Sequence, residues 1–132
     1  MSTHDVRIAE IITPIRKADA VSFDASRADL RKKFAASEHN RLLVYKNATS
    51  NIVGYIEICQ LLNKARPCPD LSDLVKPILT LTSDLPVTAA LNQLKNNNQR
   101  IALVVSERNK KILGLVTRKD LIEEFLGEMT TI

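Results

Sequence analysis

The stretch Gly114–Asp120 (GLVTRKD) contains an apolar run, then a threonine and, three residues later, an aspartate. Sixty positions earlier the chain reads Gly54–Gln60 (GYIEICQ). The glycine and the apolar run recur, but Glu57 stands in place of the threonine and Gln60 in place of the aspartate. Such a recurrence indicates one structural unit written twice, with the polar pair kept in only one copy.

The repeat extends well beyond these two stretches. Arg41–Tyr45 falls opposite residues 100–105 at an offset of 59, which predicts one additional residue in the second hairpin. Pro14 and Pro77 each precede the first strand expected in a copy. We therefore predict two halves, residues 1–66 with an N-terminal lead-in segment and residues 67–132.

Each copy shows the same order of apolar periodicities, β-α-β-β-α. Alternating or continuous apolar runs predict strands, and apolar residues three to four positions apart predict helices. The expected strands are 20–23, 42–46 and 51–56 in the first copy and 78–81, 101–106 and 111–116 in the second; the expected helices are 26–35, 58–64, 84–96 and 117 to about 127. One such unit leaves an apolar sheet face uncovered, whereas two copies packed through their sheets bury it. The sequence thus predicts an α+β fold of two β-α-β-β-α repeats with pseudo-twofold symmetry and two related clefts.

Local signals support the expected helix ends. Ser26 followed three residues later by Asp29 predicts a capping box at the start of the first helix. A helix opening near Asp84 places Pro86 in its first turn, where proline is tolerated. The asparagines at 96–98 end that helix, since asparagine is a poor helix former.

The composition bounds the function. Hydrophobic residues make up 45% of the 132 residues while aromatics make up 4%, so an aliphatic core is expected. The sequence contains neither an apolar run long enough to span a membrane nor a signal-peptide pattern. A net charge of +4 raises the alternative of nucleic-acid binding. The basic residues are scattered, however, and few aromatic residues are present for base stacking, so a solvated basic face is the favoured interpretation.

The sequence contains no pattern of a catalytic or metal site. The two histidines, His4 and His39, lie in no recognised motif, and the two cysteines, Cys59 and Cys68, have no zinc-site spacing. A glycine-rich phosphate loop is excluded because the chain has three glycines in total. We therefore expect neither an enzyme nor a resident metal ion or cofactor.

Thr117 and Asp120 have two interpretations. As a variant capping box, the threonine hydroxyl accepts a backbone N–H and the acid complements the positive end of the helix. As a ligand site, the helix N-terminus and the hydroxyl meet a phosphate, and the carboxylate accepts hydrogen bonds from a ribose diol. The repeat favours the second interpretation, because Glu57 would repel an anion and Gln60 supplies no carboxylate. This asymmetry predicts one functional and one lapsed cleft.

With these residues in place, the chain resembles a tandem of CBS domains, the Bateman module. The resemblance covers about residues 6–129, and the Gly-x-x-Thr-x-x-Asp pattern at 114–120 closes the second copy. The C-terminal part is similar to the CBS pair of the CorC/HlyC and cyclin-M (CNNM) proteins, in which a membrane domain linked to magnesium or cobalt transport precedes the pair. Residues 12–16 (ITPIR) resemble the lead-in motif of that branch, here with Ile15 inserted.

The resemblance implies roles for individual residues. Asp120 would hold the ribose hydroxyls, Thr117 would meet phosphate, and Thr13 with the strand start at Leu42–Leu43 would wall the adenine. Three further candidates are His39 against the base, Arg41 near the phosphates and Arg118 as a weaker phosphate ligand. His39 and Arg41 also fit the interpretation of ordinary surface residues. Leu43 replaces a proline usual in the family, which bears on nucleotide choice rather than on the fold.

The sequence and the resemblance together predict a non-catalytic regulatory module that binds AMP, ADP or ATP, with or without Mg2+, in one cleft between the repeats. The resemblance implies a homodimer in a soluble, cytoplasmic domain, cut from a membrane protein associated with magnesium or cobalt transport. The alternative is a dimerisation platform without a ligand, in which Thr117 and Asp120 only cap a helix. The apolar sides of the closing helices, with Leu121, Ile122 and Phe125, support dimerisation under either interpretation.

Overall fold

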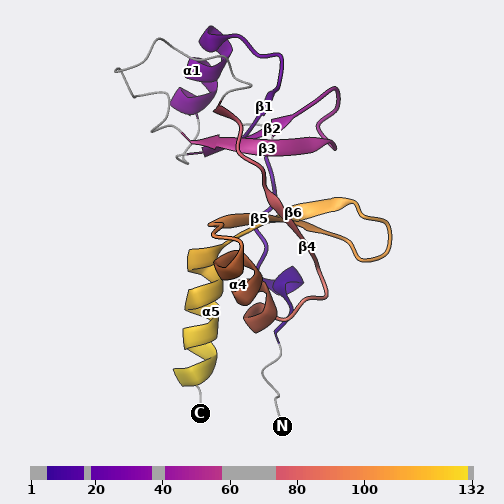
Figure 1. The fold of residues 1–132 in the computed structure, drawn as a ribbon, viewed down its shortest axis with the longest axis vertical. Coiled ribbons are helices and arrows are strands. Elements are labelled where there is room, and N and C mark those ends of the chain that lie inside the picture. The colour runs from indigo at the N-terminus through magenta and orange to yellow at the C-terminus, as the bar shows by residue number, and fades with distance from the viewer. Residues whose placement is uncertain (1–5, 17–18, 37–40, 58–73, 131–132) are drawn as a thin grey trace. The chain divides into compact units, whose positions relative to one another are not determined.

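A computed structural model describes residues 6–16, 19–36, 41–57 and 74–130 of the chain (Figure 1). The chain forms two compact units. One unit consists of residues 15–77, and the other combines residues 1–14 with residues 78–132. We call them the first unit and the second unit.

The first unit contains a three-stranded sheet in the order β1-β2-β3. Its elements are β1 (Ala20–Ser22), α1 (Arg27–Ala36), β2 (Arg41–Tyr45) and β3 (Ile52–Glu57). Strand β1 is parallel to β2, and β2 is antiparallel to β3. The predicted capping box is confirmed, because the backbone N–H of Asp29 donates to Ser26 Oγ at 3.2 Å and that of Ser26 donates to Asp29 Oδ2 at 3.3 Å.

The core of the first unit lies between α1 and one face of its sheet. Because side chains alternate across a strand, every second residue of each strand reaches this core. The buried members of this cluster are Val21, Leu30, Phe34, Leu42, Val44, Ile56 and Leu74. The expected helix at 58–64 and the linker at 66–70 lie outside the described residues.

The second unit repeats the arrangement with a sheet in the order β4-β5-β6. Its elements are the 3-10 helix η1 (Ile8–Glu10), β4 (Leu79–Thr82), α4 (Val87–Asn96), β5 (Ile101–Val105), β6 (Ile112–Thr117) and α5 (Arg118–Thr130). Helices α4 and α5 lie together on one side of the sheet (Figure 1). As predicted, α4 ends at the asparagines, and Asn98 has a φ of 53°. The helix begins at Val87, three residues later than the expected start near Asp84, because Pro86 is its N-cap rather than a first-turn residue.

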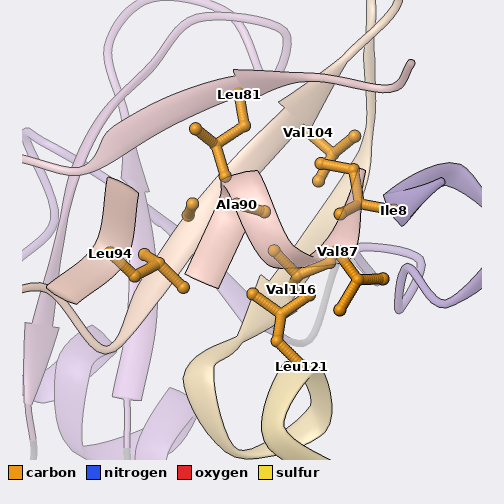
Figure 2. Close-up of a cluster of buried hydrophobic side chains, with 9 residues drawn as sticks. Ile8, Leu81, Val87, Ala90, Leu94, Val104, Val116 and Leu121 are labelled. Carbon is orange, nitrogen blue, oxygen red and sulfur yellow. The ribbon is translucent and has the colours of Figure 1, made fainter. Parts of the chain in front are cut away.

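The core of the second unit is aliphatic, as the composition predicts. Figure 2 shows side chains from both helices and the sheet meeting with Ile8 of η1. Its buried members are Ile8, Leu81, Val87, Ala90, Leu94, Ala102, Val104, Val116 and Leu121. Ile8 and Leu121 are both 0% exposed, so the N-terminal segment is an integral part of this core.

The strand registers correct the predicted alignment of the two copies. Arg41 pairs with Glu57 and Ile101 pairs with Thr117, so Arg41 corresponds to Ile101, not to Arg100. Both hairpins have their register shift at the same place, after Val44 and after Val104. The offset is therefore sixty throughout the hairpin, and the second hairpin has no additional residue. The prediction matched two arginines by side-chain type, whereas the backbone pairing decides the alignment.

A short lead-in segment pairs with the third strand of each sheet. Thr13 forms an isolated antiparallel bridge with Leu115 in the second unit, and Lys76 forms one with Tyr55 in the first. The segment that precedes each repeat in sequence thus packs on the sheet of the other repeat. The predicted division assigned residues 1–14 to the first half, but in the structure these residues belong to the second unit. The predicted boundary at 66–67 lies outside the described residues.

Candidate functional site

Thr117 and Asp120 lie where β6 passes into α5. Thr117 is the last residue of β6, and the backbone N–H of Asp120 donates to Thr117 Oγ1 at 3.1 Å. The hydroxyl oxygen therefore accepts from the protein, while its own proton is left for a second partner. In the described part of the chain no side chain bonds to the partly buried Asp120 carboxylate.

The N-terminus of α5 offers fewer backbone donors than the sequence suggested. The N–H of Arg118 donates to Arg100 O at 2.8 Å, and that of Asp120 is bound by Thr117. A helix start leaves its first four N–H groups without helical partners, and here protein acceptors take two of them. An anion at this place would therefore depend on side chains more than on the bare helix end.

Thr13 reaches the same face of the sheet as Thr117. The N–H of Thr13 donates to Leu115 O at 2.8 Å, and the N–H of Leu115 donates to Thr13 O at 2.9 Å. Paired residues of antiparallel strands place their side chains on one face, and so do residues two apart along a strand. Thr13 and Thr117, far apart in sequence, therefore share the face opposite the core residue Val116.

Leu115 is a neighbour that sequence reasoning missed. It is half-buried, pairs with Thr13 across the bridge and lies two residues before Thr117 on the same face. An apolar side chain between two hydroxyls suits a ligand with an apolar ring and a polar arm. In the sequence, Leu115 could have been noticed only as the repeat counterpart of Tyr55. That Leu115 lies beside Thr13 is shown by the strand bridge alone.

The remaining predicted residues belong to several parts of the chain. Arg41 begins β2, and Leu43 is buried in the middle of that strand opposite Tyr55, so both belong to the first unit. Their part in a shared site stays a prediction. Leu42 belongs to the core beneath α1 and is 0% exposed. His39 lies outside the described residues. Arg118 opens α5 and is half-buried.

The described residues contain no group of three His, Cys, Asp or Glu side chains that could hold a metal ion. Within those same ranges, no helix is both long and apolar enough to cross a membrane.

Comparison with known proteins identifies the fold. Residues 71–127 match the CBS domain family. The solved CBS domain of a bacterial CNNM/CorC family Mg2+ transporter in complex with ATP is 27% identical to the chain, with a TM-score of 0.81, and the match covers 94% of this chain and 89% of that one. The chain has the fold of a CBS-domain pair.

Two curated relatives extend the CBS pair's likeness to the CorC branch. The UPF0053 protein MG146 of Mycoplasma genitalium is 30% identical over 103 residues, which cover 76% of this chain and 24% of the relative. A possible hemolysin C of Rickettsia akari is 27% identical over 132 residues, which cover 98% of this chain and 44% of the relative. The CBS pair therefore spans less than half the length of these two relatives. The resemblance to the CBS pair of CorC/HlyC and CNNM proteins, predicted from the sequence, is confirmed.

Proposed function

We propose that this CBS pair is a non-catalytic regulatory module that binds an adenine nucleotide. The proposal depends on the Asp120 carboxylate, which forms no hydrogen bond or ion pair with a side chain of the described residues. Beside it, the hydroxyl of Thr117 still has a proton to donate. A carboxylate accepts two hydrogen bonds from a ribose diol, and a hydroxyl donates to a phosphate oxygen. Thr13 and Leu115 on the same face extend this surface. The ATP complex of a similar CBS domain supports the choice of ligand.

The second part of the proposal concerns the protein to which the module belongs. A similar CBS domain comes from an Mg2+ transporter, and the two curated relatives are about two to three times as long as this chain. We propose the cytoplasmic side of a membrane protein associated with magnesium or cobalt transport as the module's place. Nucleotide binding would then shift the populations of two arrangements of the module and bias the attached domain.

The proposed binding is tested by titration calorimetry with AMP, ADP and ATP, each with and without Mg2+. We expect binding to the wild type and a loss of roughly tenfold or more in Asp120→Ala, because two charge-assisted hydrogen bonds are removed. Asp29→Ala is the matched control, since it also removes an acid from the first turn of a helix but lies in the first unit. It should bind as the wild type does.

A modified ligand tests the role of the carboxylate directly. 2′-Deoxy-ATP should bind the wild type more weakly than ATP, whereas Asp120→Ala should bind the two nucleotides equally. If the deoxy sugar weakens both proteins to the same degree, Asp120 does not hold the ribose. Unchanged affinity of Asp120→Ala for ATP would contradict the site altogether.

A second candidate function, a dimerisation platform without ligand, is favoured by a different observation. Ile122 and Leu126 on α5 are 39% and 53% exposed, so the helix presents apolar side chains outside the core. Leu121, named in the sequence prediction, is instead 0% exposed. Sedimentation of Ile122→Lys beside the wild type tests this function. The platform is supported if the wild type is dimeric, the variant is monomeric and no nucleotide binds.

A further inference from the structure

The two units offer matching backbone positions for their lead-in segments. In the first unit, the N–H of Tyr55 donates to Lys76 O at 3.0 Å and the N–H of Lys76 donates to Tyr55 O at 2.8 Å. These bonds reproduce the reciprocal pair between Thr13 and Leu115 in the second unit. Lys76 is therefore the structural counterpart of Thr13, although residues 13 and 76 are 63 positions apart in sequence rather than sixty.

The strand register supplies the second correspondence. Glu57 pairs with the first residue of β2, as Thr117 pairs with the first residue of β5. Glu57 is therefore the counterpart of Thr117. Where the second unit has two threonines on one sheet face, the first unit has a carboxylate and an ammonium group at the same backbone positions.

These two charged side chains are joined to each other. Lys76 Nζ lies 3.4 Å from Glu57 Oε1, with 41% of the lysine and 27% of the glutamate side chain exposed. The ion pair joins Lys76, the residue that precedes Pro77, to Glu57, the last residue of β3. A carboxylate held at the position of Thr117 repels a phosphate, and the lysine that would attract one already has an anionic partner.

We infer that the Glu57–Lys76 ion pair fills the site in the first unit that corresponds to the Thr13–Thr117 site of the second unit. The carboxylate of Glu57 stands where the phosphate of a bound nucleotide would stand, and Lys76 neutralises it. The ion pair thereby restricts anionic ligands to the second unit. The first unit is a latent anion site that opens when the carboxylate is removed. The identity of the natural ligand rests on the proposed function, whereas the latent site depends only on the ion pair.

The test uses inorganic pyrophosphate and residue-resolved amide NMR of the whole chain, so no nucleotide is required. In Glu57→Thr, the ammonium of Lys76 loses its carboxylate partner, and pyrophosphate should shift the amide signals of Tyr55, residue 57 and Lys76. The wild type should show no such shifts in the first unit. The double variant Glu57→Thr, Lys76→Leu should lose the new shifts, because the lysine charge that attracts pyrophosphate is then absent.

A matched control removes the same charge from a different ion pair. Lys119 Nζ lies 4.0 Å from Glu123 Oε1 on α5, and Glu123→Thr should create no pyrophosphate shifts at Tyr55 or Lys76. A dispersed amide spectrum of each variant confirms folding.

The inference is overturned if Glu57→Thr shows no new shifts in the first unit, or if the double variant retains them. Failure of the proposed function is a separate result, namely the absence of ATP-dependent shifts at Thr117 and Asp120 in the wild type. The two failures concern different residues and different ligands, so each is recognised without the other.

Discussion

Asp84 lies in the turn between β4 and α4, where several groups favour its ionised form. The hydrogen bond from the Thr82 side chain is the largest cause that lowers its pKa below the ordinary value of 3.8, and Arg7 adds a smaller attraction. The pKa of Asp84 is lower in the folded chain than in the unfolded one. Ionised Asp84 therefore stabilises the fold at pH values above its ordinary pKa. The stabilisation is lost as the pH falls through the lowered folded-state pKa.

This dependence predicts how Asp84→Asn behaves. The wild type should be the more stable protein at about pH 7, and the difference in the free energy of unfolding should shrink as the pH falls through the lowered folded-state pKa. Urea unfolding at several pH values measures it. In a carboxyl NMR titration, Thr82→Val should move the pKa of Asp84 upward. A difference in stability that is constant across this pH range would contradict the account.

Single residues were predictable where their signal is local. The Thr117–Asp120 hydrogen bond follows from a three-residue spacing at a strand–helix junction, so the sequence alone suggested it. The Glu57–Lys76 ion pair spans 19 positions and depends on which strand the second lead-in segment joins. Leu115 was missed for the same reason, since its partner Thr13 comes from the other end of the chain. Residue type gives chemistry, but strand register decides which residues meet.

At the scale of elements, Gly114 permits the close approach of a lead-in segment to β6. A Cβ added at Gly114 would lie 2.5 Å from Thr13 O and 3.1 Å from Thr13 C, both backbone atoms. Gly54 meets the backbone oxygen of Lys76 in the same way in the first unit. The recurring glycine noticed in the sequence is thus explained by the space that a crossing segment requires.

Two glycine substitutions with opposite expected signs test this explanation. Gly114→Ala must displace the Thr13 backbone and should destabilise the protein by about 1–3 kcal/mol. Gly127→Ala lies on α5, where an added Cβ meets nothing within 4 Å. It should stabilise the protein by about 0.5–1 kcal/mol, because alanine favours helix. Urea unfolding compares the two variants, and a Gly114→Ala protein as stable as the wild type would refute the close approach.

The order and type of the described elements followed from periodicity, while their boundaries and alignment needed the backbone. Strands β2 and β5 were expected because their apolar runs are bounded by turn residues, and both are found. The predicted offset of 59 was wrong because it aligned Arg41 with Arg100, and side-chain identity does not report strand pairing. The start of α4 was placed too early, because proline fits both an N-cap and a first turn.

At the scale of the whole chain, each compact unit has its own hydrophobic core, but the second unit is assembled from both ends of the sequence. Ile8 belongs to the cluster that contains Leu121, more than a hundred residues later. The sequence predicted the α+β class and the two repeats because their patterns are local to each copy. It did not predict that residues 1–14 join the second unit, because no local pattern states which sheet a lead-in segment pairs with.

A reciprocal pair of core substitutions tests this assembly. Ile8 and Leu30 are 0% and 3% exposed in the cores of the second and first unit, respectively. Replacing either with alanine removes buried methyl groups and should cost about 2–5 kcal/mol. Hydrogen exchange then reports where protection is lost. Ile8→Ala should expose the amides of β5 and β6 more than those of β2 and β3, and Leu30→Ala should do the reverse. If Ile8→Ala instead weakens β2 and β3 first, the N-terminal segment stabilises the repeat that follows it in sequence, and the crossed assembly is wrong.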